Sequence, residues 1–284
     1  MKIGIAGPTE RAVAWEQHLR PHRSVSEVVI APSLDEVGAV DACFLLDESD
    51  ERLKNVLKAI RLGLHTFLIA RLPTDLSRVE KVYHAAEEAN TVLQFSHWPS
   101  LAPASQWMMG KVTKPTWLQV NREIGYYQFQ EMDTTLEYLW MDERAFCLKW
   151  IGEAVHDIDG QQINLGSAQP IGIHIFLRFD SGATAGLYVN GVASESSHKR
   201  LAADNFFMLE CDVQSQAVRV GRRAEHGSLF FERHEFEATR SAELAATQFL
   251  KAIQLRRSSA FNGYDALRLC QTVDKIRQRL YRFS

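Results

Sequence analysis

The sequence predicts two domains: an N-terminal α/β domain built on a parallel sheet, and a C-terminal α+β domain built on an open, mostly antiparallel sheet. The chain has 284 residues, more than a single hydrophobic core usually serves. Strand-like and helix-like segments alternate up to about residue 95, whereas strand-like segments dominate after Pro99, Pro103 and Pro115. We expect domains at 1–114 and 115–284, with the last helix able to pack back on the first domain.

The first domain is predicted from its hydrophobic pattern. Short apolar runs predict strands, and segments with helical spacing of apolar residues lie between them. Gly63 is expected to end one helix and Asp75 to cap the next. Such a βαβ order gives a parallel sheet of Rossmann type, with ligands bound at the carboxyl ends of the strands. The predicted strands are 2–6, 28–31, 41–46, 66–69 and 92–95, and the helices are 10–20, 50–62 and 75–89.

The second domain is predicted from successive strand-like runs bracketed by helices. Asp180–Gly182 has the composition of a hairpin turn. One sheet face is expected to carry helices, while the other shows Trp117, Phe179 and Tyr188 and pairs with another copy, giving a homodimer or higher homo-oligomer. The predicted strands are 117–124, 171–179, 184–190, 206–212, 217–220 and 229–235, and the helices are 148–165, 241–255 and 264–281.

Composition restricts the class of partner. The formal net charge is −3 and the basic residues are scattered, which predicts neither a nucleic-acid nor a membrane partner. The four cysteines are far apart in sequence, so no disulfide framework or metal site is expected. The chain begins with a strand-like segment rather than the apolar region of a signal peptide. These features predict a cytoplasmic protein.

Local motifs resemble those of one enzyme family. They follow the family's order along nearly the whole chain, and each is short. The sequence resembles the Gfo/Idh/MocA oxidoreductases, the family of glucose–fructose oxidoreductase and inositol dehydrogenase. The matching segments are Ile3–Gly7, Leu57–His65, Gln94–Pro103, Gly152–Gly166, Phe249–Ile253 and Asn262–Ala266.

The resemblance implies a nicotinamide cofactor, NAD or NADP, on the first domain. It also implies a small-molecule substrate of the sugar or polyol class, or a related carbonyl compound, against the sheet of the second. Hydride would pass between cofactor and substrate carbon. In the family a lysine from an "EKP" motif and an Asp/His pair handle the proton.

The predicted phosphate-binding turn departs from the family pattern. Glycines there let the backbone approach a diphosphate at a helix N-terminus. Of the glycine positions only Gly7 remains, followed by Thr9 and then Ala12, and Glu10 brings negative charge. These residues are candidates for cofactor binding, and a plain strand-to-helix turn is the alternative.

The next two loops also differ from the family pattern. The acidic residue that usually holds the ribose is replaced by Ser33, a weak indication of a 2′-phosphate. The loop after the third strand contributes Asp47 and Ser49 as cofactor candidates, although Ser49 or Asp50 would equally cap the following helix. The "EKP" lysine is absent, and Arg71 is the nearby cation. Arg71 can polarise a carbonyl but exchanges protons poorly at neutral pH.

The catalytic candidates are two histidines and an acid. In the predicted helix 148–165, His156 and Asp159 lie three residues apart, so the carboxylate would orient the imidazole. His97 follows the last strand of the first domain, at the edge where ligands bind. Arg122, with Glu123, is expected to face the cleft or to form an exposed ion pair. A structural role is the alternative for each histidine.

Two kinds of function follow. The first is an NAD(P)-dependent oxidoreductase with degenerate motifs. The alternative is a catalytically inactive family member that serves as a ligand-binding or regulatory protein, or as a subunit scaffold. The sequence leaves open whether the cofactor binds and whether the protein is an active enzyme, because the glycine turn, the lysine and the acid are altered together.

Overall fold

The computed structural model describes residues 1–132, 136–166, 170–224, 226–237 and 240–280. The chain divides into two compact units. The first contains Met1–Leu101 and Thr239–Cys270, and the second contains Ala102–Ala238 and Gln271–Ser284. The first unit thus ends earlier than residue 114 and regains a segment from near the end of the chain.

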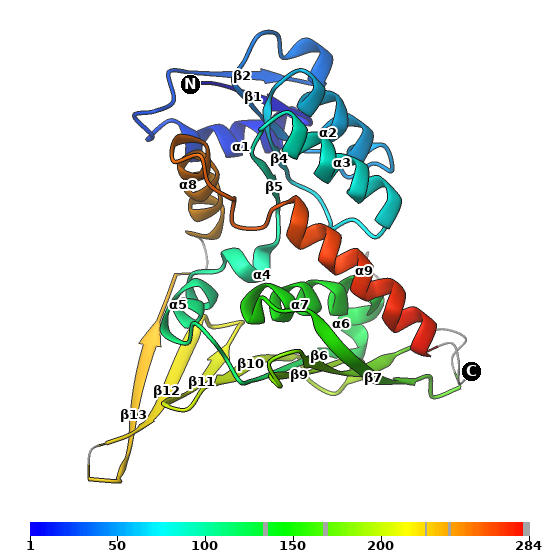
Figure 1. Ribbon diagram of the computed structural model, residues 1–284, viewed down its shortest axis with the longest axis vertical. Coiled ribbons are helices and arrows are strands. Elements are labelled where there is room, and N and C mark those ends of the chain that lie inside the picture. The colour runs from blue at the N-terminus through cyan, green and yellow to red at the C-terminus, as the bar shows by residue number, and fades with distance from the viewer. Residues whose placement is uncertain (133–135, 167–169, 225, 238–239, 281–284) are drawn as a thin grey trace. The chain divides into compact units, whose positions relative to one another are not determined.

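The first unit is built on a five-stranded sheet with the order β2-β1-β3-β4-β5, in which every neighbouring pair is parallel. The predicted parallel sheet of Rossmann type is confirmed. Figure 1 shows its strands and helices alternating along the chain. The strands are β1 (Lys2–Ala6), β2 (Glu27–Ala31), β3 (Ala42–Leu45), β4 (His65–Leu68) and β5 (Leu93–Phe95); the helices are α1 (Thr9–Leu19), η1 (Leu34–Glu36), α2 (Arg52–Arg61), α3 (Leu76–Glu88) and α4 (Trp98–Leu101).

Local sequence signals set the helix ends of this unit. Gly63 adopts a φ of 77° just after α2, a conformation that glycine reaches without a steric penalty. Asp75 caps α3, since its Oδ1 accepts a hydrogen bond of 3.0 Å from the backbone N of Arg78. Both predicted signals are confirmed. The predicted cap of α2 is wrong, because that helix follows Glu51 without a side-chain cap.

One face of the parallel sheet is covered by helices from both ends of the chain. Helix α8 (Ser241–Gln254) brings Phe249 against Phe44 and Phe67, with ring centroids 5.4 and 5.6 Å apart. Trp15 of α1 joins the same aromatic cluster. The core of the first unit therefore depends on a helix that follows the second unit in sequence.

The second unit is built on an eight-stranded sheet with the order β13-β12-β11-β10-β6-β9-β8-β7. Only the β6–β9 pair is parallel among these strands, so the predicted open, mostly antiparallel sheet is confirmed. The strands are β6 (Trp117–Gly125), β7 (Val155–Ile163), β8 (Gly172–Phe179), β9 (Thr184–Ala193), β10 (Ser197–Ala203), β11 (Phe207–Asp212), β12 (Ala217–Arg223) and β13 (Leu229–Glu235). The helices are α5 (Pro103–Lys111), α6 (Tyr126–Glu131) and α7 (Leu136–Ile151), while α9 (Gly263–Leu280) has residues in both units and the predicted end at residue 281 lies outside the described residues.

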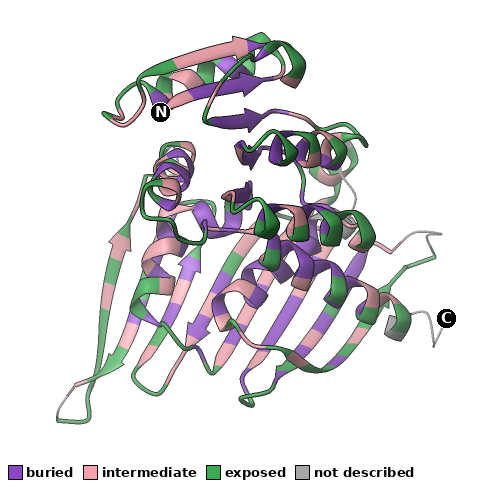
Figure 2. Ribbon diagram, turned by 45° about the horizontal axis from the view of Figure 1, so that its top comes forward, coloured by how far each residue is buried: buried purple, intermediate pink, exposed green. Residues whose placement is uncertain are grey.

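The two faces of this sheet differ in burial, as the alternation along the strands in Figure 2 shows. Leu118 and Val120 of β6 are buried on the face that carries α7, and Trp117 and the other alternate residues are half-buried. Phe179 is buried as well, so the prediction that it lies on the uncovered face is wrong. Phe179 lies on the same face of β8 as the buried residues Ile173, Ile175 and Leu177, because side chains two residues apart along a strand point to the same side.

The predicted helix 148–165 is wrong. Helix α7 ends at Ile151, where Gly152 takes a φ of 76° and donates a hydrogen bond to the carbonyl of Leu148. The chain then forms β7, which pairs along its length with β8. The apolar residues of this stretch fit helical spacing, but the left-handed glycine ends the helix and edge pairing with β8 takes over.

Among the described residues, no helix combines the length and the hydropathy that crossing a membrane requires.

Candidate functional site

A hollow lies at the carboxyl ends of β1, β2 and β3 in the first unit. Its volume is about 280 Å³, and its lining comes from the loops that follow these three strands and from α2. In a parallel sheet this is the edge where nucleotides bind. Three predicted cofactor residues meet there, namely Gly7, Asp47 and Ser49.

The turn from β1 into α1 combines features for and against an anion. Gly7 has a φ of 145°, and a Cβ on it would lie 2.7 Å from Cβ of Leu46, so this position requires glycine for packing as well as conformation. The first bond of α1 runs from the N of Ala12 to the carbonyl of Pro8, which leaves the preceding N–H groups of the first turn directed outward. Thr9 is exposed at this turn, whereas Ala12 is buried in the core.

The loop after β3 is held by its own hydrogen bonds. Asp47 accepts bonds from the backbone N of Ser49 at 2.9 Å and from Nδ2 of Asn55 at 2.8 Å. Burial opposes ionisation, but these bonds outweigh it and lower the pKa of Asp47 below its ordinary value. Asp47 is therefore ionised at neutral pH, with part of its charge taken up by the loop itself.

Two charged residues in the hollow were not predicted from the sequence. Asp35 of η1 and Lys58 of α2 both line it and form an ion pair with each other. The hydroxyl of Ser33 donates a bond of 2.7 Å to Glu36, so it is already engaged. Lys58 is far from η1 in sequence, and its helical spacing gave no indication that its side chain reaches this loop.

The remaining candidates of the first unit have different surroundings. Arg71 is exposed, and its backbone N donates a bond of 3.0 Å to the carboxylate of Glu48. His97 is completely buried, with Nδ1 2.6 Å from Oγ of Ser100 and its ring 4.6 Å from that of Phe261. These contacts fix the imidazole of His97 inside the unit.

His156 and Asp159 lie on the edge strand β7 of the second unit. His156 is exposed, with Nδ1 3.8 Å from a carboxylate oxygen of Asp180. Asp159 is also exposed, and its Oδ1 accepts a bond of 2.8 Å from the backbone N of Gly160. The predicted pairing of the two side chains on one helix face is wrong, because residues three apart in a strand do not share a face.

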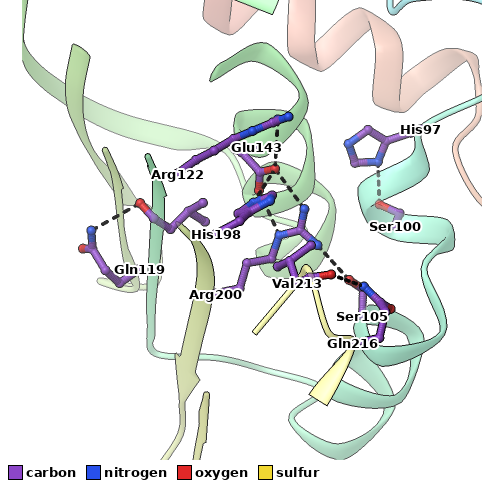
Figure 3. Close-up of polar contacts among 11 residues, drawn as sticks. His97, Ser100, Ser105, Gln119, Arg122, Glu143, His198, Arg200, Val213 and Gln216 are labelled. Carbon is purple, nitrogen blue, oxygen red and sulfur yellow. Dashed lines mark hydrogen bonds and ion pairs between the residues drawn. The ribbon is translucent and has the colours of Figure 1, made fainter. Parts of the chain in front are cut away.

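A buried charged cluster lies under α7 in the second unit, where Figure 3 shows side chains from β6 and β10 around Glu143 and Ser105 of α5 against Arg200. Arg200 binds Glu143 through Nε and Nη2, both at 2.9 Å, and donates from Nη1 to Oγ of Ser105 at 2.9 Å. Nε2 of His198 lies 3.0 Å from Oε1 of Glu143, and Nη1 of Arg122 lies 3.7 Å from the same oxygen. Glu143 and Arg200 are fully buried.

The protonation states in this cluster follow from its charges. Burial opposes the charge of Glu143, but Arg200 and then His198 outweigh it and hold its pKa well below the ordinary value. Burial lowers the pKa of His198, and the neighbouring arginines reinforce this against the attraction of Glu143. His198 is therefore neutral at pH 7, and the ionised Glu143 faces two arginines.

Asp142, the residue before Glu143, has the opposite character. It is half-buried, and burial together with the negative charge of Glu143 raises its pKa to about 7. Two neighbouring carboxyl groups thus have pKa values driven apart, an arrangement typical of acid–base sites.

Of the residues in this cluster, only Arg122 was predicted from the sequence. Arg122 lies on the helix-covered face with Glu143, while Glu123 points to the opposite face and accepts a bond of 2.7 Å from Oγ of Ser197. Helix α7 was predicted to begin too late, which excluded Asp142 and Glu143 from consideration. Strand β10, which supplies His198 and Arg200, was not predicted at all.

Comparisons with known proteins identify the fold. No protein-family model matches the sequence, and no curated protein matches it. Among solved structures, UDP-N-acetylglucosamine 3-dehydrogenase GnnA from Acidithiobacillus ferrooxidans is similar with a TM-score of 0.84 at 16% identity, over 100% of this chain and 98% of that one. An NAD binding oxidoreductase from Klebsiella pneumoniae is similar with a TM-score of 0.84 at 11% identity, over 100% and 97% of the two chains.

A third solved structure has a similar fold. The dehydrogenase MviM from Clostridium difficile is similar with a TM-score of 0.79 at 13% identity, over 99% of each chain. The similarity in all three cases covers both units rather than the first unit alone. The chain has the fold of the Gfo/Idh/MocA-type dehydrogenases, which is the fold that the motif resemblance implied.

Proposed function

We propose that the protein is an NAD(P)-dependent oxidoreductase that transfers hydride between a nicotinamide cofactor and a carbon of a sugar, a polyol or a related carbonyl compound. The observation that carries the proposal is the hollow at the carboxyl ends of β1, β2 and β3, in a chain whose whole length has a dehydrogenase fold. GnnA, which is named as acting on UDP-N-acetylglucosamine, supports the sugar class.

The residues of the hollow fit a dinucleotide in part. The first-turn N–H groups of α1, beginning at Thr9, would receive the diphosphate, and Gly7 keeps the turn tight. Asp47 and Glu10 oppose an anion, so we expect moderate rather than tight affinity. When bound, the cofactor supplies the hydride acceptor or donor.

The adenosine end of the hollow favours NAD over NADP. Asp35 follows β2, where a carboxylate can bind both hydroxyls of a ribose. A 2′-phosphate would instead meet this carboxylate, with only Lys58 to offset the repulsion. Ser33, the basis of the weak indication of NADP, is bound to Glu36.

Asp142 is the acid–base group of the proposal, with Arg122 as the residue that orients a substrate oxygen. Oxidation of an alcohol requires a group that takes the hydroxyl proton as hydride leaves, and a group with a pKa of about 7 is suited to this at neutral pH. The side chain of Arg122 is 22% exposed, and its Nη1 lies 3.7 Å from Oε1 of Glu143. The exposed His156 is the rival candidate for the same role.

The experiment that tests the proposed function is calorimetric titration with NADH and NADPH, with thermal shift measured alongside. We expect micromolar binding of NADH, weaker binding of NADPH, and cofactor reduction during a screen of sugars and polyols. Absence of binding at millimolar cofactor would contradict the proposal and favour the inactive, ligand-binding alternative.

We also propose that two copies pair through the uncovered face of the eight-stranded sheet. Trp117 and Tyr188 are half-buried there, on the face opposite Leu118 and Leu187. Light scattering is expected to give a dimer, and a strict monomer would end this part of the proposal. The four cysteines are free and buried, in line with a reducing compartment such as the cytoplasm.

A further inference from the structure

A second hollow of the first unit lies at the opposite edge of its sheet from the proposed cofactor site. Its volume is about 710 Å³, within the range of small-molecule sites. His65, the first residue of β4, and Leu93, the first of β5, lie on its floor. The end of α3 forms one wall, and the loop between α8 and α9 forms the other.

The loop that forms the second wall contains an arginine in a conformation that favours glycine. Arg256 has a φ of 48° directly after the end of α8. Its backbone N donates to the carbonyl of Ile253 at 3.3 Å, and the N of Arg257 donates to that of Ala252 at 3.0 Å, so the turn is a Schellman motif. Glycine would form this turn without strain, and arginine is strained there. A strained residue beside a hollow points to a function for its side chain.

The charges around the hollow favour an anion. Arg256 and Arg257 are exposed, and neither forms an ion pair within the part of the chain that the structure describes. Glu87 is the one acid among the described residues of the lining. His65 accepts a bond from the N of Val92 through Nδ1, and burial lowers its pKa, so it is neutral at pH 7.

Polar and aromatic groups complete the lining. The hydroxyl of Thr91 is shielded from solvent and has no hydrogen-bond partner among the described residues, which is costly unless a ligand or water meets it. The rings of Tyr83 and Tyr264 have centroids 6.2 Å apart, and Tyr264 is 52% exposed. A flat ring can stack on Tyr264 while a charged group meets the arginines.

We propose that this hollow, the arginine groove defined by Arg256, Arg257, Thr91, Tyr83 and Tyr264, binds a phosphate-bearing ligand of nucleotide size. The two guanidinium groups would hold the phosphate, and the exposed tyrosine ring would pack against the base. The groove is separate from the hydride-transfer site, so its ligand acts as an effector rather than as cofactor or substrate.

The test is calorimetric titration of the full chain with pyrophosphate and with ADP. The informative variant is Arg256→Gly, because relief of the left-handed strain is expected to raise the Tm while binding falls at least tenfold. Arg257→Gln is expected to weaken binding without a change in Tm. Arg61→Gln, an exposed arginine on α2 of the same unit, is the matched control and leaves binding unchanged.

Three results would overturn the proposal. The first is no binding of either probe at millimolar concentration. The second is binding that Arg256→Gly and Arg257→Gln leave unchanged, which would place ADP in the cofactor hollow instead. The third is a fall in Tm for Arg256→Gly, which would show that the arginine serves only to offset the carbonyl end of α8.

Discussion

The two units hold their charged residues in opposite ways. In the hollow at the carboxyl ends of β1, β2 and β3, Asp35 and Lys58 have side-chain exposures of 71% and 48%, so water screens their attraction. Under α7, Glu143 and Arg200 are almost fully buried, at 0% and 2%. Loss of one partner in the hollow leaves a charge that water solvates, whereas loss of one partner under α7 leaves a charge that nothing solvates. The first pair is suited to ligand exchange, and the second ties α5, α7 and β10 together.

The largest expected effect is that of Glu143→Gln. Arg200 would keep its buried charge with only an amide to meet it, so the free energy of unfolding is expected to fall by about 3–5 kcal/mol. Denaturant unfolding measures this. The control is Glu210→Gln, which breaks an exposed pair with Arg219 and is expected to cost at most about 1 kcal/mol. Equal losses for the two variants would remove the distinction between buried and exposed ion pairs.

Asp142→Asn, on the same helix as Glu143, is expected to affect catalysis and not folding. We expect turnover to fall by about 10²–10⁴, with the fold kept, because the amide cannot exchange the proton. For the wild type, the rate of alcohol oxidation should rise with pH through about 7, as Asp142 becomes a base. His156→Ala is the comparison. If His156→Ala abolishes turnover and Asp142→Asn does not, His156 on the edge strand β7 is the acid–base group.

Asp142→Asn is expected to change stability in the opposite direction to Glu143→Gln. The pKa of Asp142 is about 7 in the folded chain against an ordinary 3.8, so the folded state binds this proton more tightly. The resulting stabilisation is present at low pH and is lost as the pH rises from about 4 to 7. Above pH 7, Asp142→Asn is expected to be more stable than the wild type, by on the order of 2–4 kcal/mol. Urea unfolding at pH 5 and pH 8 checks this, and a variant that is equally stable at pH 8 would contradict the raised pKa.

The smallest effect is expected in the hollow of the first unit. Asp35→Asn should reduce the preference for NADH over NADPH by about tenfold, with little change in Tm. Lys58→Gln is the matched control, since it removes the opposite charge and should increase the preference. Calorimetric titration of both cofactors gives the ratio, and an unchanged ratio in Asp35→Asn would place the ribose elsewhere.

The fold was predictable from sequence wherever local signals agreed with the tertiary structure. The strands of the first unit are short apolar runs, and Gly63 and Asp75 mark helix ends chemically. The predicted hairpin turn before β9 is also confirmed, with Gly182 at a φ of 85°. The prediction around Gly152 was wrong because the apolar residues there fit helical spacing, whereas the left-handed glycine and the pairing of β7 with β8 decide the structure.

The site was less predictable because its chemistry depends on contacts between distant segments. Gly7, Asp47 and Ser49 follow strands, so topology alone brings them together. Glu143 and Arg200 lie on elements whose bounds were missed, and neither belongs to a recognisable motif. The raised pKa of Asp142 depends on burial and on a neighbouring charge, which spacing does not reveal.

The return of α8 to the first unit has a consequence for how the chain folds as it is synthesised. Phe249 and Leu250 complete the aromatic core around Phe44 and Phe67, yet they leave the ribosome after every strand of the second unit. Until then one face of the parallel sheet has only part of its apolar cover. The first unit, although its strands are synthesised first, therefore cannot close until α8 has been made, and during that interval its open face exposes apolar surface to which a chaperone can bind.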